Sequence, residues 1–296
     1  MHVLRSTALL GAAMLPLLAA TAHAQDAGTT ATTGDAAASS NYDPDWRAHT
    51  YNGPYVSGAI GWANGANGRN THLFFDRDNN GTYGDTVTTA TGANAIVGRC
   101  RGYYVSTIPG DCRADRNKID WALRAGWDKR MGNFVVGGLF EGSTNDTRDA
   151  TSAFDSSGNA YRIARGIDYG FALRGRVGWT PNGGGLFYAT GGVSYSKMKH
   201  IFRTTNTANA FTEVDPDTWR WGWQAGGGAE AMVTPRIGVG LEWLYNRIHD
   251  SDYRVAVTQG SAGATSPFVL AGGQTNMRAS KVYQYNTIRG TLTYHF

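Results

Sequence analysis

The chain has 296 residues, a net charge of +4 and a charged fraction of only 17%, with 40 glycines, 15 tyrosines and 9 tryptophans. The basic residues are scattered along the sequence, so this small positive surplus argues against nucleic-acid binding. The negative mean hydropathy does not exclude a membrane location, because strands that alternate apolar and polar residues average their two faces.

The first 24 residues have the three parts of a secretory signal peptide: a basic start, an apolar run over 8–20 and the small-x-small cleavage site Ala22-His-Ala24. The apolar run is shorter than the roughly 20 residues that a membrane-spanning helix needs, and no later segment reaches that length. We therefore predict an exported chain. Its first mature segment, 25–50, is rich in Ala, Thr, Gly, Ser and Asp and is expected to be a flexible periplasmic lead-in.

From residue 51 onward, apolar residues recur at every second position. In 119–127, for example, Trp121 and Leu123 fall on one face of an extended chain, while Asp120 and Arg124 fall on the other. Segment lengths are close to the about 9–11 residues of a tilted membrane strand, so residues 51–296 are predicted to form an eight-stranded antiparallel up-and-down transmembrane β-barrel. The eight predicted strands are 54–63, 119–127, 134–141, 167–179, 187–196, 219–233, 237–246 and 288–296.

The connections between these strands alternate between short and long. Short connections rich in Gly, Pro and Asn are typical of tight reversals, and in outer-membrane barrels such turns face the periplasm while long loops face the outside. Both termini are then expected in the periplasm. The short connections are 129–133, 181–185 and 234–236, and the long ones are 64–118, 142–166, 198–218 and 247–281.

Two alternatives have the same two-residue period. A soluble all-β barrel would alternate equally well, but the signal peptide, the aromatic C-terminus and the Trp-rich apolar face favour the membrane. A ten-stranded barrel would need hairpins inside the first and last long connections. The candidates are 70–75 with 83–88 and 253–258 with 267–270, which we interpret as extracellular extensions.

The chain ends on an alternating strand whose last residue is aromatic. One face carries Ile288, Gly290, Leu292, Tyr294 and Phe296. A closed barrel needs its last strand to pair with its first, whereas a soluble protein has no reason to end on a paired Phe. This pattern resembles the C-terminal assembly signal of Gram-negative outer-membrane barrels.

Together with the eight-strand layout, the opening segment 51–62 (YNGPYVSGAIGW) and the closing 292–296 (LTYHF) resemble the porin-like, opacity-type outer-membrane β-barrel proteins of alphaproteobacteria, which share the OmpA transmembrane architecture. The resemblance covers roughly residues 51–296 and rests on structural motifs. It implies a monomeric, surface-exposed barrel with roles in envelope integrity, adhesion or limited solute passage, and no shared catalytic residues. The expected partners are outer-membrane lipid, lipopolysaccharide, the barrel-assembly machinery and an extracellular ligand of the long loops.

The polar face of the predicted strands carries charges of both signs. An eight-stranded barrel is just wide enough for side chains to fill it, and unpaired interior charge is costly to desolvate. We therefore predict an interior ion-pair network that plugs the lumen, with a narrow water path as the alternative. Its predicted members are Asp120, Arg124, Glu141, Asp168, Arg174, Arg176, Glu230, Glu242 and Arg289.

Two features lie in the first long connection. Cys100 and Cys112 are the only cysteines, and in an exported protein such a pair is expected to form a disulfide. The segment 76–85 resembles the core of a calcium loop, with oxygen-bearing residues at alternate positions and Gly81 at the sixth, but Val87 stands where a bidentate Glu is expected. The hypotheses are a calcium site and a simple Gly-turned reversal, and no other cofactor is expected. The calcium ligands would be Asp76, Asp78, Asn80, Thr82 and Asp85.

An outer-membrane enzyme that hydrolyses lipid A or peptides is the competing class of function. His249-Asp250-Ser251 follows the seventh predicted strand at the outer rim. Neighbouring residues of a strand point to opposite faces, so these three are not expected to form a catalytic relay with one another. The other histidines, including His72, His200 and His295, are interpreted as ordinary polar residues.

Overall fold

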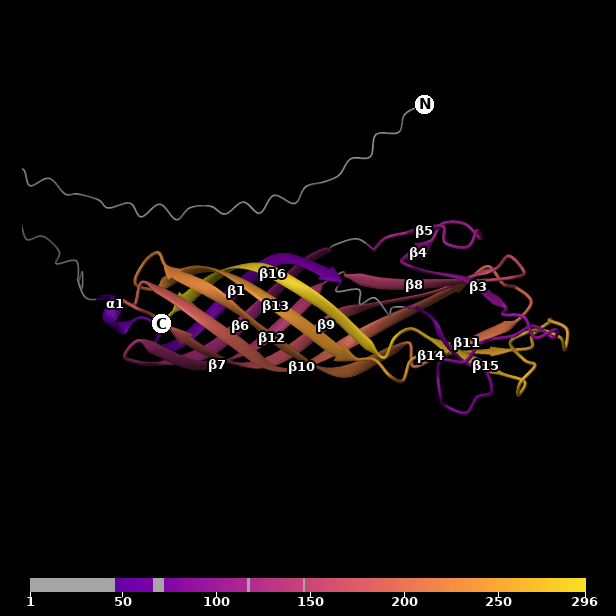
Figure 1. Cartoon of the computed structure of the whole chain (residues 1–296). Helices are drawn as coiled ribbons and strands as arrows, with labels where there is room; N and C mark the ends of the chain where they lie inside the picture. The colour runs from indigo at the N-terminus through magenta and orange to yellow at the C-terminus, as the bar shows by residue number, and fades with distance from the viewer. Residues whose placement is uncertain (1–45, 66–71, 116–117, 146) are drawn as a thin grey trace, which may run out of the picture. The chain divides into compact units, whose positions relative to one another are not determined.

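The computed structural model describes residues 46–65, 72–115, 118–145 and 147–296. The predicted signal peptide, 1–24, and most of the predicted lead-in lie outside these residues. Within them, no helix has the length and apolar character needed to cross a bilayer. Apart from one short helix, the regular elements of the described part are all β-strands in antiparallel pairings (Figure 1).

Eight strands close into a ring in which each pairs with two neighbours, so the predicted eight-stranded barrel is confirmed. The ring is sealed where the first strand meets the last, with Tyr55 opposite His295 and Gly65 opposite Tyr285. At this seam a Cβ on Gly61 would lie 1.8 Å from the carbonyl oxygen of Ile288, so only glycine allows the strands to approach. The barrel strands are β1 (Gly53–Gly65), β6 (Lys118–Met131), β7 (Phe134–Asn145), β9 (Ala160–Trp179), β10 (Gly185–Thr204), β12 (Asp217–Met232), β13 (Ile237–His249) and β16 (Val282–His295).

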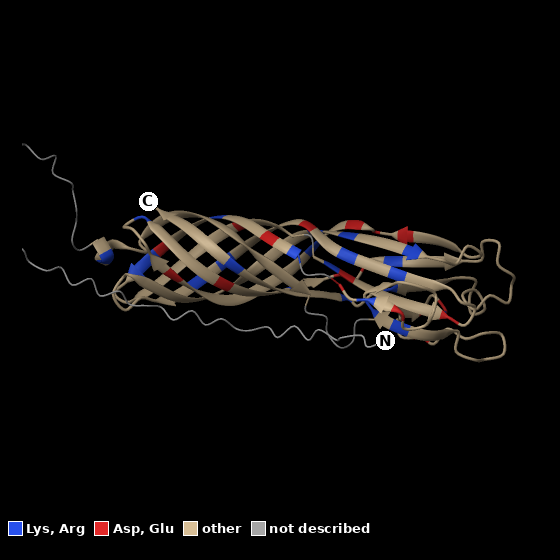
Figure 2. Cartoon of the chain, turned by 90° about the horizontal axis from the view of Figure 1, so that it is seen from above, with Lys and Arg blue, Asp and Glu red and all other residues tan. Residues whose placement is uncertain are grey.

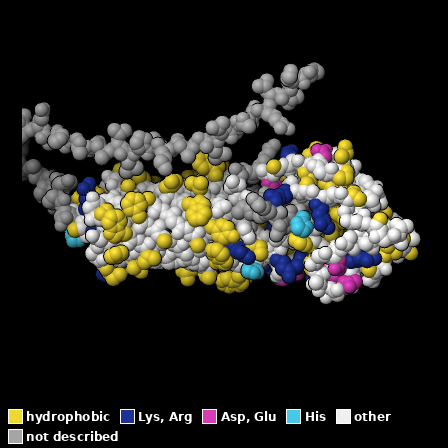
Figure 3. All heavy atoms as spheres, in the orientation of Figure 1, with side chains coloured by type: hydrophobic (Ala, Val, Ile, Leu, Met, Phe, Trp, Pro, Cys, Tyr) yellow, Lys and Arg dark blue, Asp and Glu magenta, His cyan; other side chains and the backbone are white. Residues whose placement is uncertain are grey.

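Apolar side chains face outward and charged ones inward. Ile60, Trp62 and Leu123 are 64%, 68% and 64% exposed, whereas Arg124 and Asp120 are buried. Hydrophobic side chains are accordingly spread over the visible side of the barrel, while most charged side chains in this view lie on the part beyond it (Figure 3). A soluble barrel would have the opposite arrangement.

The long connections are largely folded rather than loose. β9 and β10 are each 20 residues long and continue past the ring as a ribbon. β8 (Arg148–Asp155) pairs with this extension of β9, and β3 (Ile96–Arg101) pairs with β8. These two strands add to the barrel sheet without entering the ring, so the ten-stranded alternative is wrong.

A second sheet lies beside this ribbon. It has the order β11 (Ala210–Val214), β14 (Arg254–Thr258), β15 (Thr275–Arg278) and β2 (Phe74–Asp76). A shared apolar core contains Phe75, Val255 and Met277 from the sheet and Tyr161 and Ile163 from β9. The long connections thus build a subdomain with its own core, which we call the cap. A small hairpin of β4 (Tyr103–Tyr104) and β5 (Cys112–Arg113) flanks it.

The two predicted hairpins in these connections do not form as expected. β2 pairs with β15 rather than with 83–88, where only Thr88 makes an isolated bridge, to Asn94; residues 70 and 71 lie outside the described chain. β14 forms, but its partners are β11 and β15, and 267–270 is a turn. The local pairings are wrong because the apolar sides of these strands are buried together only by pairing across distant connections.

The end of the predicted flexible segment is ordered. Trp46–His49 form a short helix, α1, and Thr50 and Tyr51 are buried. The Thr50 hydroxyl donates to the carbonyl of Gly183, and the Arg130 guanidinium donates to the carbonyl of Arg47 at 2.6 Å. The chain therefore contacts the short turns after β6 and β9 before it enters β1.

Candidate functional site

The centre of the barrel holds three arginines and three carboxylates from five strands. Glu141 on β7 accepts hydrogen bonds from Arg124 (2.7 Å), Arg174 (2.6 Å) and Arg289 (2.9 Å). Arg124 and Arg174 also contact Glu242, at 2.5 and 3.3 Å. Arg289 completes the group by pairing with Asp120. We call these six residues the central cluster; the positions of acidic and basic residues along the barrel strands are visible in Figure 2.

A second group lies nearer the short turns. Arg176 pairs with Asp128 and lies 3.6 Å from Glu230, which is 2.7 Å from the imidazole of His295. Asp128 was absent from the predicted network although it alternates in register with Asp120 and Arg124. The strand period alone was sufficient to identify it.

Asp168 is not brought into either group, which corrects its predicted interior position. The register of β9 against β10 shifts between Lys197 and Met198, so one extra residue is accommodated on β9. Such a bulge turns Asp168 to the outside, where its carboxylate pairs with the Lys199 amine at 2.9 Å. Strict alternation across 167–179 could not reveal this irregularity.

Apolar layers lie on both sides of the charged groups. The layer toward the short turns contains Tyr51, Val135, Leu186 and Tyr188. The layer toward the cap contains Ala63, Ile167, Met198, Ile248, Tyr283 and Tyr285. The described barrel interior therefore contains charged groups, apolar layers and buried neutral polar side chains such as Ser57, Thr190 and Gln224.

A further buried ionic group joins the barrel to the cap, and sequence reasoning missed it. Arg165 on β9 pairs with Asp149 at 3.0 Å and Asp250 at 3.1 Å, and Asp250 also contacts the His200 imidazole at 3.0 Å. Burial opposes ionisation of Asp250, but hydrogen bonding to His200 and the charge of Arg165 lower the pKa of this carboxyl below its usual value. The ring of Tyr253 stacks on His200 with centroids 4.0 Å apart.

The rim residues 249–251 do not converge on one point. His249 is exposed, Asp250 is buried against Arg165 and His200, and the Ser251 hydroxyl donates to Asp252. This geometry provides no nucleophile and base in contact within the segment, as expected from strand alternation.

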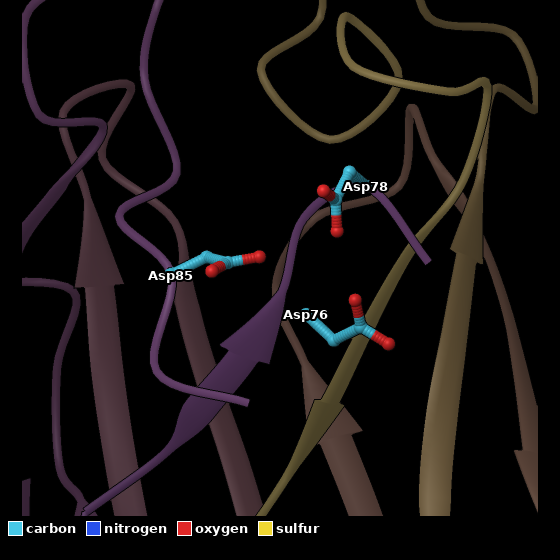
Figure 4. A group of neighbouring side chains, drawn as sticks. All are labelled: Asp76, Asp78 and Asp85. Carbon is cyan, nitrogen blue, oxygen red and sulfur yellow. The ribbon is translucent and has the colours of Figure 1, made fainter. Parts of the chain in front are cut away.

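The candidate calcium segment forms a hydrogen-bonded turn after β2. The carboxylate of Asp76 accepts from the backbone amides of Asn80 and Gly81, and Asp85 accepts from that of Arg77. Ligand oxygens of Asp76, Asp78 and Asp85 lie within 4.8 Å of one another (Figure 4). The side-chain oxygen of Asn80 accepts a hydrogen bond from the backbone amide of Thr82. Val87, at the twelfth position, is buried. The turn is thus closed by its own hydrogen bonds, as the simple-reversal hypothesis requires.

Two other predicted features have clear positions. Cys100 on β3 and Cys112 on β5 form a disulfide, which ties the β4–β5 hairpin to the sheet. In the C-terminal strand, Ile288, Leu292, Tyr294 and Phe296 are exposed by 51%, 59%, 37% and 69%, so the segment proposed as an assembly signal presents its apolar side to the outside. Gly290 shares that face.

Comparison with known proteins finds similarity to outer-membrane proteins. No family model matches the chain. Residues of the chain are 26% identical over 123 positions to the 31 kDa outer-membrane immunogenic proteins of Brucella melitensis and Brucella suis. The match covers 42% of this chain and about half, 51%, of those relatives.

Solved outer-membrane barrels are more distant. OprG from Pseudomonas aeruginosa aligns over 83% of this chain and 98% of its own, with a TM-score of 0.47 and 11% identity. The protease OmpT from Escherichia coli aligns over 83% and 98%, with a TM-score of 0.37 and 11% identity. The closed eight-stranded ring, together with the similarity to the Brucella outer-membrane proteins, confirms the predicted resemblance to outer-membrane β-barrel proteins of alphaproteobacteria.

Proposed function

We propose that this barrel is closed to solutes and acts as a structural and surface-display protein of the outer membrane. The observation that carries the proposal is the central cluster, whose six side chains are each less than 8% exposed. Three guanidinium groups and three carboxylates balance one another, so no net charge remains to attract water or ions through the centre. The apolar layers on either side oppose hydration of the lumen, and α1 contacts the turns at one end.

The proposed orientation places the short turns and the described start of the chain in the periplasm and the cap outside the cell. Its support is the length asymmetry of the connections, because outer-membrane barrels have short periplasmic turns. In the variants Asn182→Cys and Thr265→Cys, the new cysteine lies at an exposed position of a short turn and of the cap, respectively. A membrane-impermeant maleimide should label Thr265→Cys on intact cells and Asn182→Cys only after lysis; the reverse pattern would refute the orientation.

Planar-bilayer conductance of the purified protein tests closure. A closed barrel should give no stable openings under conditions in which a sixteen-stranded porin, measured in parallel, conducts steadily. Stable porin-like openings of the folded protein would refute the proposal. The folded state is checked in the same preparation by its heat-dependent migration on gels.

The enzyme alternative has less support. The carboxylate of Asp250 in the rim segment pairs with Arg165 and His200, and His249 is exposed. We propose that the chain is not an enzyme, that it is a monomer, and that any extracellular ligand binds the folded cap. The C-terminal strand is proposed as the signal for the barrel-assembly machinery.

A further inference from the structure

The outward face of β10 changes from mainly apolar and aromatic residues to mainly basic residues after Tyr195. Val193 and Tyr195 are exposed, and the next residues on the outward face are Lys197, Lys199, Ile201 and Arg203. Aromatic rings mark the same level on the neighbouring strands, because Lys197 lies opposite Tyr169 on β9 and Trp219 on β12. Tyr and Trp prefer the membrane interface, so this level marks the edge of the hydrocarbon on the cap side.

A lipid-facing groove reaches this edge. It has a volume of about 480 Å³ and runs along β7 between walls from β6 and β9. The groove is open in its middle because Gly142 has no side chain, and a Cβ there would meet only the ring of Phe171, at 3.8 Å. The principal walls are formed by Trp121, Leu123, Phe140, Tyr169 and Phe171. The groove is lined mainly by apolar side chains, which suits a hydrocarbon chain.

Basic residues lie directly beyond the end of this groove that is nearer the cap. The hydroxyl of Thr144, which lines the groove, donates to the carbonyl of Asp168, and the Asp168 carboxylate pairs with Lys199. Gly166 lies between Arg148 on β8 and Lys199 on β10 in the same row of the sheet. A Cβ on Gly166 would come within 3.2 Å of the Arg148 Cγ, so the side chain of Arg148 packs against Gly166.

The charges of this row are only partly neutralised. Asp168 and Asp217 are the carboxylates opposite or beside Lys199. Within the described chain, Arg148 and Lys197 take part in no ion pair, and Lys197 instead lies 5.8 Å from the centre of the Tyr169 ring. Guanidinium and ammonium groups with free donors at a membrane edge are suited to bind phosphate.

We propose that this surface binds a lipopolysaccharide molecule of the outer leaflet, with one acyl chain along the groove and a phosphate group held by Arg148, Lys197 and Lys199. The proposal rests on the orientation given above, which places the cap side at the outer leaflet. It deepens the proposed function by assigning the lipid contact to one side of the barrel. A phosphate next to several saturated chains matches both the basic row and the groove below it.

The test is binding of purified rough-type lipopolysaccharide to the full folded chain in detergent, measured by native mass spectrometry. The double variant Arg148→Glu/Lys199→Glu should lose affinity by about tenfold or more, equivalent to about 1.4 kcal/mol. The matched control is Arg99→Glu/Arg101→Glu, which makes the same charge change at exposed positions of β3. It should bind within about twofold of the unaltered chain.

The groove is tested separately by filling it. Gly142→Leu places a side chain in the groove without a backbone clash, and Gly138→Leu adds the same side chain on the lipid face of the same strand, outside the groove. Only Gly142→Leu should reduce binding. Dephosphorylated lipopolysaccharide should bind the unaltered chain and the Arg148→Glu/Lys199→Glu variant equally weakly.

If the two test variants bound lipopolysaccharide as tightly as the two control variants, the site would be overturned. If the unaltered chain bound phosphatidylglycerol as tightly as lipopolysaccharide, the assignment to lipopolysaccharide would be overturned. Folding of each variant is verified by heat-dependent gel migration, so loss of binding cannot be mistaken for loss of the barrel. Because the assay uses detergent, it is independent of orientation. Maleimide labelling that reverses the orientation would refute the proposed function while leaving the binding result intact.

Discussion

Replacing Glu141 by Gln tests whether the barrel interior is dry. The Glu141 carboxylate accepts hydrogen bonds from Arg124, Arg174 and Arg289. Removing its charge still leaves each of these arginines with another carboxylate partner. Arg124 and Arg174 keep Glu242, and Arg289 keeps Asp120. The substitution therefore leaves three buried positive charges against two negative ones, a single uncompensated charge. Removing one partner of a buried ionic group costs about 3 to 5 kcal/mol, and we expect that loss in the free energy of unfolding.

The measurement is equilibrium unfolding in urea of the protein reconstituted in lipid vesicles, followed by tryptophan fluorescence. Asp168→Asn is the matched control: it also converts a carboxylate to an amide, but its pair with Lys199 is exposed and should contribute less than about 1 kcal/mol. If both variants were destabilised by less than about 1 kcal/mol, water would be reaching the central charges. The proposal of a closed lumen would then fail along with the reasoning.

Further outcomes are expected outside the membrane. Cys112→Ser should cost up to about 3 kcal/mol locally by releasing the loop from Cys100, seen as faster proteolysis of the cap while the barrel persists. Because the pKa of Asp250 is lowered in the folded state, its contribution to stability is present above the ordinary Asp pKa and is lost as pH falls below it. Acid unfolding of Asp250→Asn should therefore depend less on pH in that window. Adding calcium or a chelator should leave the melting temperature unchanged, since the Asp76 turn is closed by hydrogen bonds; a calcium-dependent increase would establish the metal hypothesis. His249→Ala should leave the lipid A profile unchanged by mass spectrometry, and an altered profile would support the enzyme class.

The barrel was predictable because lipid imposes a simple rule on every strand. Each residue that faces hydrocarbon must be apolar, so the two-residue period is visible from Val56 on β1 to Phe296 at the end of the chain. The interior positions of Arg124, Glu141 and Arg289 follow from the same alternation. The actual ion pairs do not, because they depend on which strands lie across the lumen from one another.

The cap could not be predicted from local pattern. β2 and β15 pair although Asp76 and Asn276 are 200 residues apart in sequence. Outside the membrane the rule for side chains is weaker, since a strand needs only one partner and a partly apolar face. Local hairpins were therefore inferred where the chain instead pairs distant connections. The interior position predicted for Asp168 was wrong for a similar reason. A bulge adds one residue and so changes the face on which a side chain lies, and the composition of the strand does not reveal it.

The two long strands explain how a closed barrel can present a rigid surface. β9 and β10 are continuous from the short-turn end through the aromatic level to the cap, and the separate cap sheet packs on their extension through a shared apolar core. Arg165 and its partners Asp149 and Asp250 reinforce that junction with buried ion pairs. A ligand of such a surface binds without ordering a loose loop, which removes a conformational entropy cost of about 1 to 2 kcal/mol for each residue that would otherwise be fixed. The folded core and strand pairing of the cap, rather than passage through the barrel, are therefore the features on which the proposed surface role depends.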